Sequence, residues 1–365
     1  MKKHNSKSEL PIVVIMAGGK GERFWPKSTE SKPKQLQKIY SHKTLLEETL
    51  QRAYSLTEKE LVFIGCNKEL KKAIQKELGL KDKQFIVEPF GKNTAPIVAL
   101  SSLILEEKYP DRVHVVLSAD HYIYPLNEFK KTIQKAIELA KQNYLVTCGI
   151  IPTRPEIGYG YIQKGNSIQE LGYYVTKFHE KPEISKALEY VKKGFYWNSG
   201  IFIWKGKKII EAFEQYAGEI LQPIREGYKS ASKLQKAFES IPELPIDIAI
   251  MEKAKDVAVV ESSFVWDDVG SWLSLERIYQ NDKDKTDDKQ NILLLPKKAH
   301  HLMFDSHNNI VSVETPKFIA FLGMENVVIV ETEKVLFVAK KDRLSDIKNL
   351  IKEIKQNPTL HPFIK

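Results

Sequence analysis

The residues Ile12-Val-Val-Ile-Met-Ala-Gly-Gly-Lys-Gly-Glu-Arg-Phe-Trp-Pro26, with Lys32-Pro-Lys-Gln35 close behind, carry the strongest structural signal in the chain. The first five are apolar and mostly β-branched, which is typical of a buried strand. A loop follows in which glycine occupies positions 18, 19 and 21. Such a loop lets backbone N–H groups approach an anion closely. Because an arginine and two lysines come next, the stretch predicts a site for the phosphates of a nucleotide.

Length and composition indicate an ordinary globular protein with room for two domains. The 365 residues are 42% hydrophobic and 28% charged, with a net charge of +9. The lysines are scattered along amphipathic segments rather than gathered in one run, so we expect small anionic substrates and no nucleic-acid partner. The first nine residues are polar, and no apolar run is long enough for a membrane span. We therefore expect a cytoplasmic protein without a membrane partner.

The two cysteines, Cys66 and Cys148, lie far apart, with no CxxC pattern and no histidine pair nearby. This spacing favours neither a zinc site nor a disulfide framework. Each follows a short β-rich run, where cysteine is usually a small core residue.

Short apolar runs alternate with helical patterns along the first 150 residues. The expected strands are 12–16, 61–65, 84–87, 113–117 and 145–150, and the expected helices are 44–56, 69–78, 94–107 and 126–142. This alternation predicts an α/β fold whose mixed, mostly parallel sheet is covered on both faces, giving three layers. Ligands of such sheets bind beyond the carboxyl ends of the strands. We therefore expect the glycine loop, the segment after Val87 and residues 118–121 to converge.

The second half of the chain has a different pattern of expected strands and helices. Further strands are expected at 158–162, 174–180, 196–204 and 257–261, and helices at 184–193, within 205–240 and at 247–253. The charged run 280–290 is the best domain boundary, so we expect domains at 1–284 and 285–365. The second domain shows short β segments at 292–295, 310–314, 318–322, 326–331 and 335–339, then a helix at 344–355.

The opening stretch resembles the signature of the sugar-phosphate nucleotidylyltransferases. The resemblance continues in order through Glu88-Pro-Phe-Gly-Lys-Asn-Thr-Ala-Pro96, Leu117-Ser-Ala-Asp-His121, Ile157-Gly-Tyr-Gly-Tyr-Ile162, Phe178-His-Glu-Lys-Pro182, Trp197-Asn-Ser-Gly200 and Trp266-Asp-Asp-Val-Gly-Ser-Trp272. The motif at 88–96 is similar to that of the mannose-1-phosphate guanylyltransferase branch. The resemblance implies a Rossmann-like nucleotidyltransferase domain followed by a small β-helix-like domain that ends in a helix. Longer relatives add an isomerase domain, so no isomerase activity is expected here.

The resemblance implies that GMP passes from GTP to α-D-mannose 1-phosphate, giving GDP-mannose and pyrophosphate. The second pKa of a phosphate monoester is about 6, so the attacking oxygen is already ionised at neutral pH. What the reaction needs is charge neutralisation and in-line positioning, for which Mg²⁺ and basic side chains are suited.

The family pattern assigns the metal to Asp120 and Asp268, with Asp267 as the rival of Asp268. A single aspartate after a strand is equally often a turn or helix cap. The resemblance assigns Arg23 to the β- and γ-phosphates and Lys34 to the α-phosphate and leaving group. Many relatives have threonine where this chain has Glu22, which places a negative charge beside the triphosphate.

The remaining site residues fall into two groups by the same resemblance. The nucleotide group is Ala17, Gly18, Gly19, Gly21, Glu22, Arg23, Lys34, Glu88, Asn93, Thr94 and Ala95. The sugar group is Gly158, Tyr159, Gly160, Glu180, Lys181, Asn198 and Asp268, with Lys181 on the sugar phosphate. The alternative for Glu180 and Lys181 is an exposed ion pair of little energetic value. His121 and His179 are expected to position or pack, and Trp25, Trp266 and Trp272 to lie in the core or a pocket wall.

Three alternatives stay open. The same chemistry could serve another sugar 1-phosphate or another nucleoside triphosphate. A dinucleotide-dependent oxidoreductase is disfavoured because Phe24 stands where the fingerprint has its third glycine. A regulatory homologue without activity is disfavoured because every proposed ligand is present. Family habit further suggests a homo-oligomer, with a dimer favoured and the C-terminal domain as the contact surface.

Overall fold

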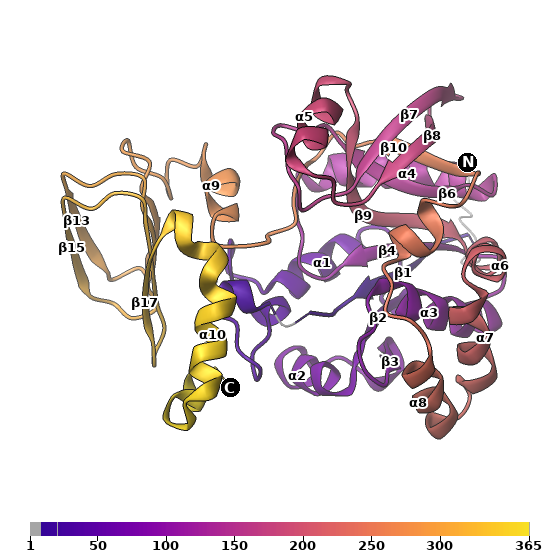
Figure 1. Ribbon diagram of the computed structural model, residues 1–365, viewed down its shortest axis with the longest axis horizontal. Helices are drawn as coiled ribbons and strands as arrows, with labels where there is room; N and C mark the ends of the chain where they lie inside the picture. Colours follow the sequence, from indigo (N-terminus) through magenta and orange to yellow (C-terminus); the bar gives the residue numbers. More distant parts are fainter. Residues whose placement is uncertain (1–8, 20, 365) are drawn as a thin grey trace, which may run out of the picture. The chain divides into compact units, whose positions relative to one another are not determined.

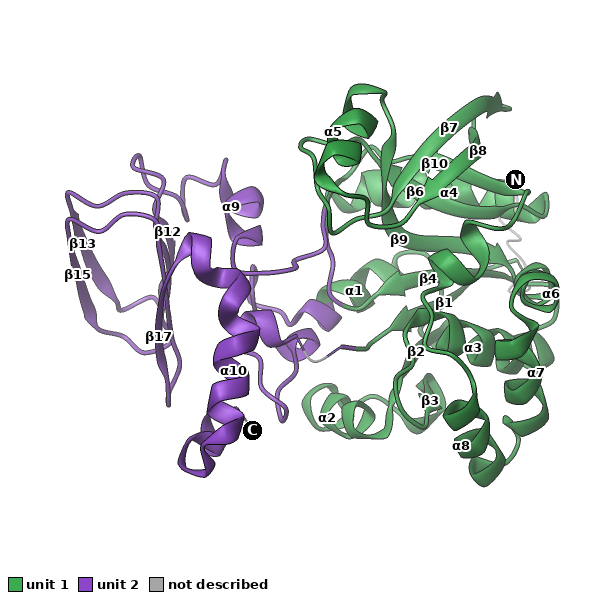
Figure 2. Cartoon of the chain, in the orientation of Figure 1, with its two compact units in different colours: residues 1–18, 48–119, 123–266 green, residues 19–47, 120–122, 267–365 purple. Residues whose placement is uncertain are grey.

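The computed structural model describes residues 9–19 and 21–364. The polar N-terminus and Lys20 of the glycine loop, both used in the sequence interpretation, lie outside the described residues. The chain divides into two compact units, coloured separately in Figure 2. Unit 1 comprises residues 1–18, 48–119 and 123–266, and unit 2 comprises residues 19–47, 120–122 and 267–365. No helix in the described part of the chain is long and apolar enough to cross a membrane.

Unit 1 is built on a nine-stranded mixed sheet (Figure 1). Its strands are β1 (Ile12–Met16), β2 (Val62–Asn67), β3 (Phe85–Glu88), β4 (Val113–Ser118), β6 (Leu145–Ile150), β7 (Tyr161–Ile168), β8 (Gly172–His179), β9 (Tyr196–Lys205) and β10 (Val257–Glu261). Their order is β3-β2-β1-β4-β9-β6-β10-β8-β7. Only β8 and β9 run against the others, so the prediction of a mixed, mostly parallel sheet is confirmed.

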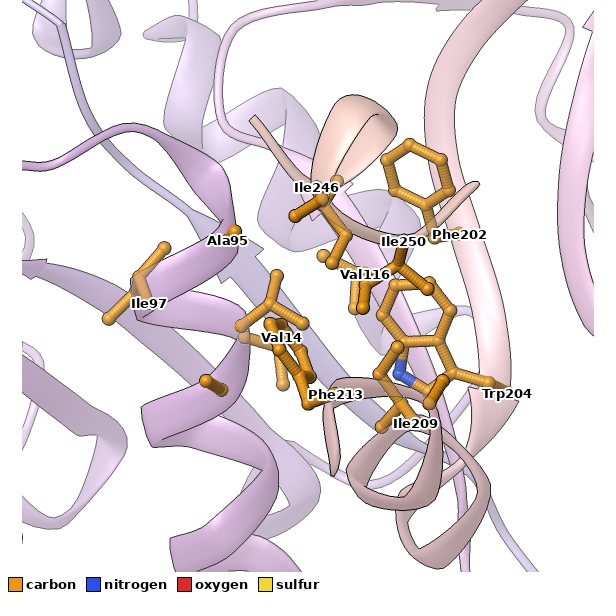
Figure 3. Close-up of a cluster of buried hydrophobic side chains, with 14 of the residues drawn as sticks. Val14, Ala95, Ile97, Val116, Phe202, Trp204, Ile209, Phe213, Ile246 and Ile250 are labelled. Carbon is orange, nitrogen blue, oxygen red and sulfur yellow. The ribbon is translucent and has the colours of Figure 1, made fainter. Parts of the chain in front are cut away.

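Helices cover both faces of this sheet. They are α1 (Leu45–Tyr54), which begins in unit 2, α2 (Lys68–Leu78), α3 (Thr94–Lys108), α4 (Leu126–Lys141), α5 (Ile184–Lys192), α6 (Gly206–Tyr216), α7 (Gly218–Gly227) and α8 (Ala231–Ser240). Figure 3 shows Val14, Val116 and Phe202 of the sheet in one cluster with α3 and α6. Because side chains alternate along a strand, the intervening residues face the other way, where α4 packs on β6, β9 and β10. The three predicted layers are confirmed.

Two details of unit 1 differ from the sequence expectation. The strand expected at 158–162 begins only at Tyr161. The Tyr161 hydroxyl accepts from the N–H of Glu156 at 2.9 Å, and the Glu156 carboxylate accepts from the N–H of Gly158 at 3.1 Å. These bonds close a local loop instead of a ladder. The segments β5 (Tyr122–Tyr124) and β11 (Val265–Asp267), which were not expected, form a separate two-stranded sheet.

The strand ends place the candidate residues. The N–H of Ala17 donates to the carbonyl of Gly65 at 2.8 Å, and the N–H of Ala119 donates to the carbonyl of Met16 at 3.0 Å. These bonds extend the ladders past the last strand residues, so the chain leaves β1 and β4 side by side. Cys66 and Cys148 are buried and unbridged, and burial raises the pKa of each thiol to about 12. The prediction that they are core residues is confirmed.

Unit 2 contains short strands wound into two small sheets. They are β12 (Ile292–Leu294), β13 (His300–Phe304), β14 (Ile310–Ser312), β15 (Phe318–Leu322), β16 (Val327–Glu331) and β17 (Leu336–Lys340), with α9 (Ser274–Tyr279) before them and α10 (Ile347–Gln356) after them. One sheet has the order β12-β14-β16-β17, and β13 pairs with β15 in the other. The parallel pairing of successive turns makes a short β-helix, as expected. The buried Asn309 amide, which donates to Asn291 Oδ1 at 2.9 Å, links neighbouring turns.

The segment that follows the glycine loop folds within unit 2. Phe24 and Trp25 belong to one core cluster with Trp272 and residues of β17 and α10. The Trp25 indole N–H donates to the carbonyl of Phe363 at 3.0 Å, and that of Trp272 donates to the carbonyl of Trp25 at 3.2 Å. The expectation that Trp25 and Trp272 are core residues is therefore confirmed.

Gly21 offers a test of this packing. Its φ is +63°, and an added Cβ would lie 2.3 Å from the Lys34 Cβ. Gly79 has almost the same φ, +64°, but open space around the Cβ position. We expect Gly79→Ala to lower the free energy of unfolding by about 1–2 kcal/mol through backbone strain alone. Gly21→Ala adds overpacking of about 1–3 kcal/mol and should be clearly the more destabilising in urea unfolding. Equal losses in the two variants would contradict the tight packing of Gly21 against Lys34.

Candidate active site

Lys34 is the centre of a charged cluster in unit 2. Its Nζ lies 2.8 Å from Asp120 Oδ2 and donates to the backbone carbonyl of Asp268 at 3.2 Å. The ammonium also lies 5.6 Å from the ring centre of Phe24, and only 7% of the residue is exposed. A buried ammonium needs such partners, because removing one leaves an uncompensated charge. The structure thus joins three of the four predicted catalytic residues, because Asp120 and Asp268 both bind the ammonium of Lys34.

Electrostatics keep the Asp120 carboxylate ionised. Burial alone would raise its pKa, but the charge of Lys34, then that of His121 and the hydrogen bond from Lys34, outweigh burial, so the pKa is lowered. An ionised carboxylate is what a metal ligand requires.

The choice between Asp267 and Asp268 has a structural basis. Arg277 donates to both oxygens of the Asp267 carboxylate, whose Oδ1 also accepts from the N–H of Val269 at 2.8 Å. Asp267 is 4% exposed, whereas Asp268 keeps partial exposure. The Asp268 carboxylate accepts from the N–H of Gly270 at 3.1 Å within the same turn. Asp267 therefore fixes the turn, and Asp268 is the better ligand candidate.

The backbone of this turn is strained. Val269 has a φ of +49°, although it is β-branched and buried in the core cluster. Positive φ is a genuine outlier for such a residue, and outliers of this kind cluster at active sites. The hydrogen bonds from Asp267 and the packing of Val269 hold the strained turn in place.

The phosphate-side residues of unit 2 are less enclosed. Arg23 is exposed, as a residue that meets a ligand from solvent would be. Glu22 Oε1 lies 3.6 Å from the Nζ of Lys355 on α10, which partly offsets its negative charge. The carbonyl of Gly19 accepts from the Gln35 amide at 3.5 Å, linking the glycine loop to the segment of Lys34.

The donor set fits a hard divalent cation only with help from the substrate. No group of three or more His, Cys, Asp or Glu side chains gathers as a metal cage in the described ranges 9–19 and 21–364. Mg²⁺ commonly uses one or two carboxylates and takes its other ligands from phosphates and water. Asp120, whose carboxylate binds the Lys34 ammonium, and Asp268, whose backbone carbonyl accepts from the same ammonium, match that pattern.

In unit 1, the predicted base residues lie at the end of β3 and the start of α3. Glu88 is 6% exposed, its Oε2 is buried without a hydrogen-bond partner among the described residues, and burial raises its pKa to about 8. Asn93, at a φ of +69°, caps the N–H of Thr94 through its side chain at 3.0 Å. The Thr94 hydroxyl accepts from the N–H of Ile246 at 2.8 Å, and Ala95 is buried.

The predicted sugar residues also gather in unit 1. The N–H of Asn198 donates to the carbonyl of Gly160 at 2.9 Å. A Cβ on Gly160 would lie 2.7 Å from Glu180 Oε2, so only glycine lets that carboxylate come so close. Lys181 Nζ lies 2.9 Å from Glu180 Oε1, and Lys181 has a φ of +45°. Its side chain is 61% exposed, and that of Glu180 is 13% exposed.

Aromatic packing supports this group. The buried Tyr159 ring lies 5.2 Å from Trp197 and 5.0 Å from Trp266, centre to centre, while Gly158 beside it is exposed. His179 stacks on Tyr190 with ring centres 4.8 Å apart, which agrees with the packing role expected for it.

Sequence reasoning missed a carboxylate beside Asn198. The Asn198 Nδ2 donates to Asp247 Oδ1 at 2.7 Å, and its Oδ1 accepts from the Thr147 hydroxyl at 2.9 Å. Glu252, on the same turn as Asp247, accepts from the N–H of Glu180 at 3.1 Å. Asp247 stands alone among apolar residues in Ile246-Asp-Ile-Ala-Ile-Met251, so neither a glycine nor a charge pattern marks it.

Comparisons with known proteins agree with this geometry. Residues 12–285 match the model of the nucleotidyl transferase family, and residues 299–354 match that of the MannoseP isomerase/GMP-like β-helix domain. A mannose-1-phosphate guanylyltransferase of Klebsiella pneumoniae is 35% identical over 95% of this chain and 74% of its own length. The enzyme RfbM of Salmonella typhimurium, of the same name, is 36% identical over 95% of this chain and 73% of its own length.

A solved structure resembles the whole described fold. A Thermus thermophilus protein, described as a mannose-1-phosphate geranyltransferase, matches with a TM-score of 0.86 and 30% identity. The match covers 94% of this chain and 99% of that protein. Together with the residues gathered around Lys34 and Asn198, these matches show that the chain belongs to the nucleotidyl transferase family, in the branch of the mannose-1-phosphate guanylyltransferases.

Proposed function

We propose that this protein transfers GMP from GTP to α-D-mannose 1-phosphate, forming GDP-mannose and releasing pyrophosphate. The observation that carries the proposal is the cluster in which the buried Lys34 ammonium meets Asp120 and Asp268 at the loops of the family motifs. The names of the relatives at 35% and 36% identity support the choice of substrates.

The chemistry is a substitution at the α-phosphorus of GTP. A phosphate oxygen of the sugar 1-phosphate forms the new bond to the α-phosphorus, and the bond to the oxygen that bridges the α- and β-phosphates breaks. The nucleophile is already ionised because its second pKa is about 6, so no side chain has to remove a proton. Bound Mg²⁺, held by Asp120 and Asp268, would supply neutralising charge to the phosphates.

The side chains of unit 2 then have distinct tasks. Lys34 offsets charge on the α-phosphate and the leaving pyrophosphate, and Arg23 binds the β- and γ-phosphates through paired N–H donors. The backbone N–H groups of the glycine loop add directional donors to the same phosphates.

The side chains of unit 1 bind the base and the sugar. The unpaired Glu88 carboxyl oxygen is an acceptor suited to the N1–H and N2–H donors of guanine. Glu180 and Asn198 bind sugar hydroxyls, and Lys181 binds the sugar phosphate. The domain boundary near residue 284 and the cytoplasmic location stay predictions from the sequence.

The first test is pyrophosphate release from GTP and mannose 1-phosphate, with and without Mg²⁺. We expect turnover only with the metal and with this substrate pair preferred over other sugar 1-phosphates and over ATP, UTP and dTTP. Asp120→Asn and Asp268→Asn should each lower kcat by at least about 100-fold, because a charge-stabilising ligand is lost. Asp268→Asn should keep a melting temperature close to that of the parent, whereas Asp120→Asn leaves the buried Lys34 ammonium without its carboxylate and should melt lower.

Asp267→Asn is the matched control. It removes an anion that Arg277 binds within the fold, so it should lower the melting temperature more than Asp268→Asn does. Near-normal turnover of Asp268→Asn, or an equal preference for all four nucleotides, would contradict the proposed assignment.

Glu88 provides a separate test of base recognition. At pH 9, where a Glu88 carboxyl with a pKa of about 8 is ionised, we expect Glu88→Gln to lower kcat/KM for GTP by about 10–100-fold, because hydrogen bonds to a charged group contribute about 1.5–3 kcal/mol. The kcat/KM for inosine triphosphate, which lacks the N2 amino group, should fall by a smaller factor in the same variant. Glu106→Gln is the control, since Glu106 Oε2 is also buried without a partner among the described residues but lies on the last turns of α3. Equal losses for the two nucleotides would remove Glu88 from the base pocket.

We further propose that the protein is a homodimer joined through the outer face of the β13–β15 sheet. In register, Phe318 faces His300, Ala320 faces Leu302, and Leu322 faces Phe304. The exposed fractions are 65% for Phe318 and 75% for Leu322. Of the alternate residues, Phe321 lies in a small core, and Met303 and Ile319 pack against it.

A second copy is the occupant that this face fits. Strand β15 reads Phe-Ile-Ala-Phe-Leu, without the charge or proline that usually protects a sheet edge. The outer face exposes Leu302, Phe304, Phe318 and Leu322, and contiguous apolar patches of this kind mark protein interfaces. A two-fold axis would place the same uncharged face on itself, as most homodimers do.

Sedimentation equilibrium tests the dimer. The chain mass is 42.0 kDa, and we expect twice that value at micromolar concentration. The double variant Phe318→Glu, Leu322→Glu should sediment as a monomer with unchanged helix content, because both side chains point outward. Leu350→Glu on α10, 40% exposed, is the control and should stay dimeric. A monomeric parent, or a double variant that remains dimeric, would contradict this interface.

A further inference from the structure

The Asn198 amide is held in one orientation by its neighbours. Its Oδ1 accepts from the Thr147 hydroxyl at 2.9 Å and from the N–H of Gly200 at 3.2 Å, which uses both lone pairs. One hydrogen of its Nδ2 goes to Asp247 Oδ1 at 2.7 Å. The second Nδ2 hydrogen has no hydrogen-bond partner among the residues that the structure describes, and it is the Asn198 donor left for a ligand. Asp247 is therefore the group that fixes where this donor points.

The Asp247 side chain stands on a rigid turn. Residues Asp247–Met251 form a single π-helical turn, closed by the N–H of Glu252 donating to the Asp247 carbonyl at 2.9 Å. Such turns are rare and occur often at functional sites. Figure 3 shows Ile246 and Ile250 of this segment among the core side chains of β9, α3 and α6. The apolar residues on either side of Asp247 thus anchor it.

The same turn is tied to the base segment. The N–H of Ile246 donates to the Thr94 hydroxyl at 2.8 Å, and the N–H of Ala95 donates to the carbonyl of Leu244 at 3.0 Å. The residues assigned to the base and the turn that carries Asp247 are therefore one hydrogen-bonded piece of unit 1.

The charges around Asp247 are mostly negative. Glu180, at the end of β8, and Glu252, on its own turn, are carboxylates, and Lys181 is the one cation that acts on it. Burial of the Asp247 carboxylate, then the charge of Glu180, raises its pKa to about 7. A carboxylate kept at this energetic disadvantage calls for a reason other than stability.

We propose that Asp247 is a positioning residue for the sugar phosphate: it orients the free Asn198 N–H toward a sugar hydroxyl and holds the sugar pocket in register with the base segment. This inference rests on the proposed transfer of a nucleotide to a sugar 1-phosphate and adds a residue to that site. Asp247 acts through Asn198, so its loss should weaken sugar binding before it affects GTP.

Two substitutions separate orientation from charge. In Asp247→Ala nothing accepts from Asn198, so we expect KM for mannose 1-phosphate to rise at least about tenfold, in line with a lost hydrogen bond to a charged group. KM for GTP should change less than about twofold by the same reasoning. In Asp247→Asn the new side-chain oxygen can still accept from Asn198, so KM for the sugar should return to within about threefold of the parent. Glu243→Gln, an exposed carboxylate just before the turn, is the matched control.

The pH profile gives a readout that a purely structural residue would not move. The parent should gain kcat/KM for the sugar phosphate as pH rises through about 7, because Asp247 ionises and becomes the stronger acceptor. Asp247→Asn should lack this step and keep only the ionisation of the substrate phosphate, near pH 6.

Stability should change in the opposite sense. Because folding raises this pKa above its ordinary value of 3.8, the group favours the folded state at low pH, and this contribution is lost as pH rises through about 7. Asp247→Asn should therefore melt at a higher temperature than the parent at pH 8. A residue kept only for structure would melt lower.

The outcomes are distinguishable. A parent that releases no pyrophosphate from GTP and mannose 1-phosphate overturns the proposed function itself. A parent that turns over normally while Asp247→Ala behaves like Glu243→Gln overturns the role of Asp247. A rise in both KM values together, or a sugar KM that Asp247→Asn fails to restore, also overturns the positioning role.

Discussion

The contact between the Lys34 ammonium and the Asp120 carboxylate is the interaction on which the charged cluster of unit 2 depends. Asp120 and Asp268 come from chain segments almost 150 residues apart. Lys34 joins them, because its Nζ lies 2.8 Å from Asp120 Oδ2 and donates to the backbone carbonyl of Asp268. The ammonium that stabilises the folded cluster is thus the same group that is assigned to the α-phosphate.

The position of Lys34 in turn depends on the C-terminal part of the chain. The segment between the glycine loop and α1 packs in one core with β17 and α10, and Trp25 is hydrogen-bonded to Phe363. Glu22 of this segment pairs with Lys355 of α10. Within unit 2, the last helix therefore takes part in holding the phosphate-side residues, in addition to closing the β-helix.

The fold was largely predictable because its strands and helices are strongly patterned. The runs at 12–16, 145–150 and 257–261 were predicted to the residue, since each is rich in apolar and β-branched residues. Strand β13 was not, because His300 and His301 hide its alternation. Its outward apolar face can be identified only when the register with β15 is known.

The candidate site was predictable where motifs mark it and not where long-range packing makes it. The resemblance pointed to Lys34, Asp120 and Asp268, which the structure gathers. It favoured Asp268 over Asp267 by the register of the motif, but it could not give the physical reason, which depends on Arg277 ten residues from Asp267. Asp247 was not predicted, because nothing in its apolar segment marks a functional carboxylate. Its role depends on the hydrogen bond from Asn198, which lies far away in the sequence.

Three features of the candidate site share a physical property: they make the folded state less stable than a simpler residue would. Val269 holds a positive φ, and Glu88 and Asp247 carry carboxyls whose raised pKa values show that their charged forms are disfavoured on folding. Each such feature costs on the order of 1–3 kcal/mol, a sizeable part of a typical total stability. Since all three lie in segments assigned to metal, base or sugar, the strain is concentrated where binding can offset it. This distribution is typical of a ligand-binding site. The stability of the fold therefore comes from the buried cores around β1 and Trp25.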